Sequence, residues 1–179
     1  MRIQVTIFKR MSHYASAIAR KMGMNKQKME SLLYTVPMHD AGKIGIPDYI
    51  LLKPGKLNDK EWKIMKKHTV IGAKILASSD VKSIKLAQTI ALTHHEKWDG
   101  SGYPKGLKGS KIPLAGRIAA IADVFDALTS KRPYRIKPFS LEEAFDYIEK
   151  ERGRYFDPKV VDAFLAAKDE ILVFYIKEE

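Results

Sequence analysis

The apolar residues of this chain recur at steps of three and four through most of its length. That spacing gathers them on one side of an α-helix, whereas a half-buried strand would alternate apolar and polar residues. Helical segments are expected at residues 7–22, from 26 towards 39, 58–76, 80–94, 114–129, from 140, and from about 158. No strand pattern is found, so the sequence predicts an all-α fold of roughly seven helices.

Two of these helices begin with the pattern of a capping box, in which a polar side chain and a glutamate three residues later bond each other's backbone. Asn58 with Glu61 and Ser140 with Glu143 fit this pattern. The segments 42–57 and 96–113 contain many Gly and Pro residues, so the first is expected to be a loop with at most one short helix and the second a long structured loop. Long loops in compact domains are usually functional.

The length and composition indicate one domain covering residues 1–179, since 179 residues with 45% hydrophobic content are too few for two. The chain has no cysteine, which excludes disulfides and thiolate metal sites. No apolar run approaches the roughly 18–20 residues of a membrane span, and the start lacks a signal-peptide core. We therefore expect a cytoplasmic protein without a membrane span.

The charge balance favours anionic partners, because the chain has 32 Lys and Arg residues but only 21 acidic residues, which gives a net charge of +11. No basic tract is interleaved with stacking aromatic residues, as a binder of single-stranded nucleic acid would need. We therefore expect no polymeric nucleic acid partner. A lysine-rich solvated surface is the simplest explanation of the charge, and a small phosphorylated substrate would benefit from the same field.

Histidine and aspartate residues fall near the ends or on the inward stripes of four expected helices. They are His39, Asp40, His68, His94, His95 and Asp123. A single inward histidine is more often a hydrogen-bonded core residue than a ligand. Leaving so many buried polar groups without partners would cost about 1–3 kcal/mol each, and cations would satisfy them. Ligands this far apart in sequence suit a bundle core, so we expect a centre of two metal ions.

Several long segments resemble the HD-GYP domain, in that family's order and spacing. They are HDAGKIGIPDYILLKPGKL, HTVIGAKIL, HHEKWDGSGYPKGLKG, IPLAGRIAAIADVFDALTSKRPYR and FDPKVVDAFL, and the match covers roughly residues 8–166. The resemblance implies a single helical domain of the HD superfamily. It implies a metal-dependent phosphodiesterase of signal transduction that hydrolyses cyclic di-GMP to pGpG, and in some members onward to GMP. The family commonly uses iron or manganese.

The resemblance also implies how the metal ions are held. His39 and Asp123 would hold the first ion, and Asp40 would bridge the two ions. His68 and His94 would hold the second ion. An aspartate adjacent to a histidine can reach two cations at once, so Asp40 is expected to act in catalysis.

Further residues of the pattern are expected at the rim of the site. His95 would be an additional ligand of the second ion or of a third. Lys43 would give a positive charge to a phosphate oxygen and so take part in catalysis and substrate binding. Arg132 and Arg135 would contact the substrate phosphates, and Asp126 resembles a family residue near the substrate, although an ordinary helix-surface acid is nearly as good an explanation.

The tripeptide Gly102-Tyr103-Pro104 lies in the second expected loop. Glycine lets the backbone turn tightly at the edge of a site, proline stiffens it, and tyrosine offers a ring with a hydroxyl. In the resembled family this loop is linked to contacts with GGDEF-type cyclic di-GMP synthases. A rigid lid over the metal ions is an equally good explanation.

The first expected helix departs from the family pattern, which has a glutamate and then a histidine where this chain has Ile3 and Ile7. Isoleucine cannot bind a metal, so a third ion would lack its glutamate and the first ion would lose a histidine. His13 is expected to lie on another side of the helix, as a surface or supporting residue. The helix also begins so close to Met1 that the domain looks shortened at its N-terminus.

Three alternatives to a cyclic di-GMP phosphodiesterase follow. The loss of family ligands at Ile3 and Ile7 favours a weakened or inactive domain that acts as a cyclic-dinucleotide receptor or docking module. A phosphodiesterase for another cyclic dinucleotide, such as cyclic GMP-AMP, fits because the quoted residues contact phosphates more clearly than bases. A general HD nucleotide phosphohydrolase is disfavoured by the long GYP-region match.

Overall fold

The computed structural model describes the backbone of residues 2–130 and 137–177, and the side chains of residues 9–130 and 137–175. The α-helices in these ranges are α1 (Arg2–Lys21), α2 (Lys26–Thr35), α3 (Asp48–Leu51), α4 (Asp59–Met65), α5 (His68–Leu76), α6 (Lys82–Thr93), α7 (Leu114–Thr129), α8 (Leu141–Lys150), α9 (Pro158–Ala166) and α10 (Lys168–Lys177). The 3-10 helices are η1 (Val36–Met38), η2 (Ala41–Gly45) and η3 (Gly109–Lys111). The described residues contain no strand, only an isolated bridge between Arg152 and Phe156, so the all-α prediction is confirmed.

The described residues form more helices than the seven expected, for identifiable reasons. The segment 58–76 is two helices, α4 and α5, because the chain turns at Lys66 and Lys67, where the sequence has no breaker. The short α3 lies inside a segment expected to hold at most one short helix. The last segment continues past α9 into α10. Both capping boxes, at Asn58 and Ser140, are confirmed.

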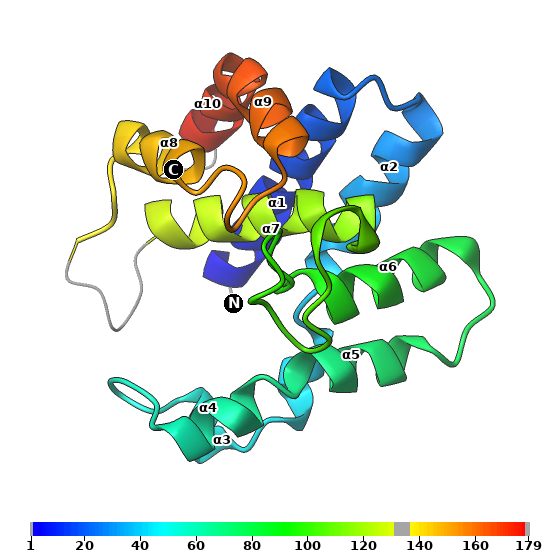
Figure 1. Cartoon of the computed structure of the whole chain (residues 1–179), viewed down its shortest axis with the longest axis vertical. Coiled ribbons are helices and arrows are strands. Elements are labelled where there is room, and N and C mark those ends of the chain that lie inside the picture. The colour runs from blue at the N-terminus through cyan, green and yellow to red at the C-terminus, as the bar shows by residue number, and fades with distance from the viewer. Residues whose placement is uncertain (1, 131–136, 178–179) are drawn as a thin grey trace.

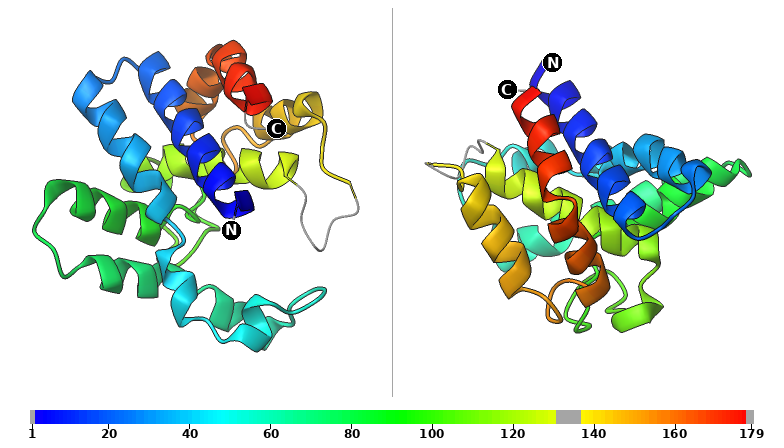
Figure 2. Two further views of the ribbon diagram at one scale, coloured as in Figure 1. Left: turned by 180° about the vertical axis from the view of Figure 1, so that it is seen from behind. Right: turned by 90° about the horizontal axis from the view of Figure 1, so that it is seen from above.

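The hydrophobic core lies around α7, which crosses the middle of the molecule (Figure 1). Helix α1 packs across α7, and α10 runs beside α1 (Figure 2). Tyr14 of α1 and Phe164 of α9 each meet the Phe125 ring of α7 edge to face, with ring centroids 5.3 and 5.2 Å apart. Helices α5 and α6 pack against each other on the far side of α7 from α8 and α9, and α3 and α4 project beyond them. None of the helices in the described ranges combines the length and apolar character needed to cross a membrane.

The approach of η2 to α5 depends on a glycine. A Cβ atom added to Gly42 would collide with the backbone of His68 and of Gly72. Only a residue without a side chain therefore lets η2 lie directly on the first turn of α5. This contact brings Asp40, which directly precedes η2, next to His68, and Lys43 within η2 reaches the same carboxylate.

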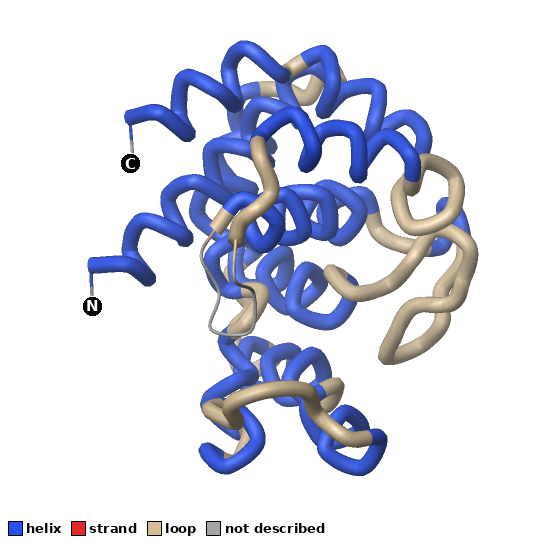
Figure 3. The backbone as a smooth tube through the Cα atoms, turned by 90° about the vertical axis from the view of Figure 1, so that its left-hand side faces the viewer, coloured by secondary structure: helices blue, strands red, loops and turns tan. Residues whose placement is uncertain are grey.

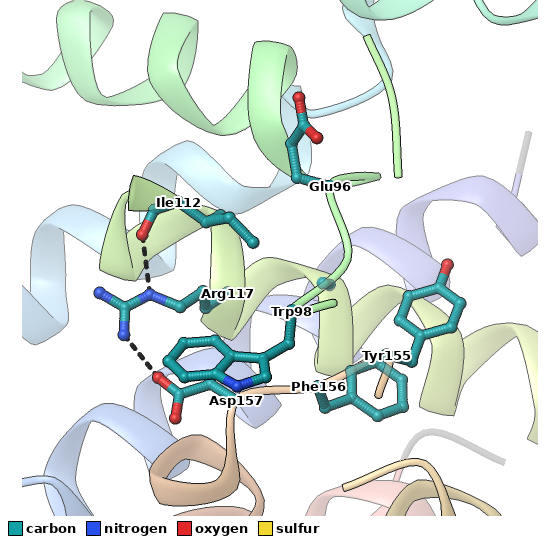
Figure 4. A pocket seen from close by; sticks show the side chains of 8 residues that line it. Glu96, Trp98, Ile112, Arg117, Tyr155, Phe156 and Asp157 are labelled. Carbon is teal, nitrogen blue, oxygen red and sulfur yellow. Dashed lines mark hydrogen bonds and ion pairs between the residues drawn. The ribbon is translucent and has the colours of Figure 1, made fainter. Parts of the chain in front are cut away.

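The long loop between α6 and α7 lies beside the segment between α8 and α9, on one side of the molecule (Figure 3). The backbone N–H groups of Trp98 and Asp99 donate to the carbonyl oxygens of Tyr155 and Arg154, at 2.9 Å each. Arg117 of α7 fixes the end of this loop, since its Nε donates to the Ile112 carbonyl and its Nη1 to the Asp157 carboxylate, at 2.8 and 2.5 Å (Figure 4). The loop is therefore a rigid part of the fold.

Candidate metal centre

Three buried histidines meet at the ends of three different elements. His39 directly follows η1, His68 is the first residue of α5, and His94 directly follows α6. The Nδ1 atoms of His39 and His68 lie 2.8 Å from the carbonyl oxygens of Val36 and Met65. The Nδ1 of His94 lies 3.0 Å from a carbonyl oxygen of its own helix. A carbonyl oxygen can only accept a hydrogen bond, so each Nδ1 carries the proton and each Nε2 presents a lone pair.

These lone pairs point to one place. The Nε2 atoms of His68 and His94 lie 3.4 Å apart, and the His39 and His94 rings meet edge to face with centroids 5.0 Å apart. Two acceptor nitrogens gain nothing from facing each other in a buried site unless a proton or a cation lies between them. Backbone bonds that fix the Nδ1 proton are typical of metal-ligating histidines.

Asp40 supplies carboxylate oxygens to the same place. Its Oδ2 lies 3.2 Å from the His39 Nε2 and accepts a 2.5 Å hydrogen bond from the Lys43 Nζ. Its Oδ1 lies 3.4 Å from the His68 Nε2 and 3.9 Å from the His94 Nε2. This Oδ1 is buried and has no hydrogen-bond partner among the described residues, which is costly for a carboxylate unless a cation satisfies it.

Four of the five shifted pKa values in the cluster favour the forms that bind cations. Burial would raise the pKa of the Asp40 carboxyl, but His39 and Lys43 hold it well below its usual range. Burial lowers the pKa of His68 and of His94, and it lowers the pKa of His95 to about 4. For His39, burial is outweighed by Asp40 and the pKa is raised. At neutral pH the centre therefore offers three neutral imidazoles, of His68, His94 and His95, and an ionised Asp40 carboxylate, whereas the raised pKa of His39 favours its protonated form until a cation displaces the proton.

The remaining candidates, His95 and Asp123, lie at the edge of the cluster. The His95 ring is centred 4.0 Å from that of His94 and 5.1 Å from that of His68. The Asp123 Oδ1, on α7, lies 3.9 Å from the His39 Nε2. Potential ligand atoms gather into two groups, His68 with His94 and His95, and His39 with Asp40 and His94. The donor set fits two divalent ions, with His94 common to both groups.

Some expected site residues lie elsewhere. The Asp126 carboxylate is fully buried, where it accepts from the Arg10 Nε at 3.1 Å and from the Ser130 hydroxyl at 3.2 Å. A substrate cannot reach it there, so the expected contact does not fit this structure. The His13 ring stacks on Phe174 at 4.0 Å, as a supporting residue would.

Four expectations concern residues that the structure does not describe. Arg132 and Arg135 lie outside the described residues, and so do the side chains of Ile3 and Ile7. The GYP tripeptide is described. A Cβ atom on Gly102 would collide with the backbone of residues 95–97, so the loop passes directly over that turn. The Tyr103 ring lies 4.8 Å from the His95 ring, at the edge of the centre.

Sequence reasoning missed Glu96, which shapes this loop. Its side chain is 2% exposed, and its two oxygens accept the backbone N–H groups of Lys105 and Leu107 at 2.8 and 2.9 Å. The available signal was the position of Glu96 directly after the histidine pair. A glycine-rich loop follows it, and the backbone N–H groups of such a loop need acceptors. Trp62 and Lys66, which flank Tyr103, were also missed, because nothing in the sequence places α4 beside the loop.

Several known proteins are similar to this chain in sequence. The HD domain family matches residues 5–160. A protein called cyclic di-GMP phosphodiesterase, from Thermotoga maritima, is 50% identical over 170 residues, which are 95% of this chain and 46% of that protein. The cyclic di-GMP phosphodiesterase response regulator RpfG of Xanthomonas campestris is 47% identical over 90% of this chain and 43% of its own length. The 3'3'-cGAMP-specific phosphodiesterase 2 of Vibrio cholerae is 45% identical over 91% of this chain and 31% of its own length.

Thus the chain spans less than half the length of these curated relatives. Solved structures share its fold at low sequence identity. Bd1817, an HDG"Y"P protein from Bdellovibrio bacteriovorus, superposes with a TM-score of 0.70 at 18% identity, over 93% of this chain and 51% of that one. The cyclic GMP-AMP phosphodiesterase V-cGAP3 of V. cholerae gives a TM-score of 0.66 at 18% identity, over 96% and 49%.

Proposed function

The chain belongs to the HD domain family, and from that membership we propose that it is a metal-dependent phosphodiesterase that hydrolyses cyclic di-GMP. The proposed product is pGpG, with further hydrolysis to GMP. The names of relatives at 50% and 47% identity support cyclic di-GMP as the substrate. The continuous core from Met11 to Ile171 supports our further proposal that residues 1–179 fold as one domain.

The observation that carries the proposal is the convergence of acceptor atoms. The Nε2 atoms of His68 and His94 face each other at 3.4 Å, and a buried Asp40 oxygen lies against both without a hydrogen-bond donor among the described residues. An arrangement of acceptors only is unfavourable unless cations occupy it. Paired cations held in this way can catalyse the hydrolysis of a phosphodiester.

Two divalent ions, iron or manganese, are the proposed cofactors, because imidazole with carboxylate suits both metals. His39 and Asp40, with Asp123 beside them, would hold one ion. His68, His94 and His95 would hold the other ion, and Asp40 would lie between the two. When bound, the ions supply Lewis acidity, which polarises the phosphodiester and lowers the pKa of a water molecule.

Lys43 is proposed to bind the phosphate. Its side chain is 41% exposed, and its ammonium is held 2.5 Å from the Asp40 Oδ2, at the mouth of the centre. A phosphate oxygen arriving there would meet a positive charge already fixed in place, so little ordering is needed on binding. Arg132 and Arg135 stay proposed phosphate contacts on sequence grounds.

Two roles are proposed for the GYP loop, as a lid over the metal centre and as a contact for a protein partner. Tyr103 lies against His95, which supports a lid role for this part of the loop. Ser101, Lys105 and Lys108 are exposed on the same loop and are available to a protein partner. We retain GGDEF-type synthases as the proposed partner, to be tested by co-purification with wild-type and Lys105→Glu protein.

Hydrolysis is tested by incubating the purified chain with cyclic di-GMP after loading with Mn²⁺, or anaerobically with Fe²⁺. Chromatography should show pGpG or GMP, and Asp40→Asn should reduce the rate at least 100-fold. Absence of product with both metals contradicts the proposal. Calorimetric binding of cyclic di-GMP without turnover would favour the receptor alternative.

Cyclic GMP-AMP is a second candidate substrate, because a relative at 45% identity is called 3'3'-cGAMP-specific. Competition between cyclic di-GMP and 3'3'-cGAMP in one reaction gives the ratio of their kcat/KM values directly. A ratio above one assigns the chain to cyclic di-GMP. A ratio below one assigns it to the hybrid dinucleotide.

A further inference from the structure

Three side chains from two segments form a group beside the metal centre, which we call the Trp62–Lys66–Tyr103 shelf. The Trp62 ring on α4 and the Tyr103 ring in the GYP loop meet edge to face, with centroids 6.3 Å apart. The Lys66 ammonium lies 5.8 Å from the Trp62 ring centroid and 5.2 Å from that of Tyr103. These are cation–π distances, so the positive charge is held close to both rings.

Tyr103 connects the shelf to the centre. Its ring lies 4.8 Å from the His95 ring at an interplanar angle of 31°, and 6.5 Å from the His68 ring. Its backbone N–H donates to the His95 carbonyl oxygen at 3.1 Å. The shelf therefore lies on the side of the centre formed by His68 and His95.

The position of Tyr103 is fixed by its surroundings. The buried Glu96 carboxylate accepts two backbone N–H groups from the residues that follow the GYP tripeptide. Gly102 passes so close to the backbone of residues 95–97 that a side chain would not fit there. Hydrogen bonds to an ionised carboxylate are about twice as strong as neutral ones, so the loop presents Tyr103 in one place.

The outer part of the shelf is open. Trp62 is 44% exposed, and α4 contributes no buried residue to the core. The Lys66 ammonium forms no ion pair or hydrogen bond with the described residues. A tryptophan held for packing alone is usually well buried. This one leaves a large aromatic surface and an unneutralised charge next to the place where a phosphodiester is proposed to bind.

We infer that the Trp62–Lys66–Tyr103 shelf binds a guanine base of the cyclic dinucleotide, an inference that rests on the proposed function. The base would stack on the Trp62 ring, since every base has a π-face and stacking on aromatic side chains is strong. The Lys66 ammonium would donate to the guanine O6 and N7 atoms, a common pairing in nucleic-acid recognition. Adenine presents an amino group in place of O6, so Lys66 favours guanine.

Fluorescence tests the stacking. The chain has two tryptophans, so the Trp98→Phe variant leaves Trp62 as the single reporter. Adding cyclic di-GMP to the Mn²⁺-loaded variant should quench or shift Trp62 emission with a saturable dependence on concentration. Calorimetric binding of cyclic di-GMP without any change in Trp62 emission would overturn the shelf.

Affinity measurements test the contribution of each residue. Trp62→Ala should weaken cyclic di-GMP binding about tenfold or more, within the range seen for base–aromatic stacking, while its bound Mn²⁺ is unchanged. The matched control is Tyr34→Ala, which removes an aromatic residue that is 69% exposed on α2 and should leave binding unchanged. Equal affinity for Trp62→Ala and the unaltered protein, or loss of Mn²⁺ together with binding, would overturn the inference.

Lys66→Met tests base selection, because methionine keeps a long apolar side chain without the charge. It should weaken cyclic di-GMP several-fold and leave cyclic di-AMP unchanged. Equal weakening of both dinucleotides would overturn the guanine contact.

Failure of the shelf is distinct from failure of the proposed function. Binding without turnover contradicts hydrolysis alone, whereas turnover with an unaltered KM in Trp62→Ala contradicts the shelf alone.

Discussion

His68 and His94 face each other with their Nε2 atoms 3.4 Å apart, while each Nδ1 is bound to a backbone carbonyl oxygen. Both pKa values are lowered by burial, so neither ring carries a second proton at neutral pH. The pair therefore cannot form a hydrogen bond between the two nitrogens. The fold holds two lone pairs together, and this geometry becomes favourable when a cation joins them.

His94→Ala should remove most metal binding, because His94 belongs to both groups of potential ligands. Mn²⁺ at 100 times its dissociation constant should stabilise the unaltered protein by about 2.7 kcal/mol, and this gain should vanish in the variant. Thermal melts with and without Mn²⁺, together with elemental analysis, measure it. His13→Ala is the control, since His13 stacks on Phe174 outside the cluster. Normal Mn²⁺ content in His94→Ala would contradict the assignment.

The metal-free protein should lose stability as the pH falls from about 6.5 to about 4. Burial lowers the pKa of His95 to about 4, so the unfolded chain takes up a proton in this window and the folded protein does not. The lowered pKa values of His68 and His94 also reduce the free energy of unfolding as the pH falls. The raised pKa of His39 has the opposite effect.

Urea unfolding of the chelator-treated protein at several pH values checks this dependence. One proton contributes at most about 1.4 kcal/mol per pH unit. His95→Gln should therefore reduce the slope of the free energy of unfolding against pH. Equal slopes in the two proteins would show that His95 does not titrate as described.

The sequence predicted the helical class and the set of converging residues, because both follow from periodicity and from the placement of histidines at helix ends. His39, Asp40, His68, His94, His95 and Asp123 are all brought together. The sequence did not predict the break between α4 and α5, since Lys66 and Lys67 carry no helix-breaking signal. It also misjudged Asp126, because a helix position one turn from Asp123 can face either the centre or the buried Arg10.

Glu96→Ala should destabilise the protein by about 3–6 kcal/mol. The change leaves the N–H groups of Lys105 and Leu107 without their acceptor, and each lost charge-assisted bond is worth about 1.5–3 kcal/mol. Glu143→Ala is a matched control, because Glu143 also accepts a backbone N–H but lies in an exposed capping box. It should cost about 1 kcal/mol or less. Chemical denaturation measures both, and equal losses would contradict a special role for Glu96.

Asp126→Asn should lower stability by about 3 kcal/mol, because it leaves the buried charge of Arg10 without its carboxylate partner, although the Ser130 hydroxyl still accepts from Arg10. Adding Arg10→Met to this variant should recover part of the loss, as expected when two residues interact directly. A double-mutant cycle by urea unfolding gives the coupling. Additive losses from the two changes would mean that the ion pair contributes nothing.

Gly42→Ala should disrupt both the fold and the centre. The new Cβ would collide with the backbone of His68 and Gly72, so η2 must move away from α5 and carry Asp40 and Lys43 with it. We expect the free energy of unfolding to fall by more than about 3 kcal/mol, at the upper end for overpacking. Calorimetry should also show weaker Mn²⁺ binding.

Gly45→Ala is the control for this change in the same short helix. The nearest atoms to its Cβ would be carbons of the Ile71 side chain, the first at 2.9 Å, and that side chain can adjust. It should therefore cost about 1 kcal/mol and leave Mn²⁺ binding intact. If Gly42→Ala instead kept full stability and metal affinity, the close contact between η2 and α5 would not be what holds Asp40 against His68.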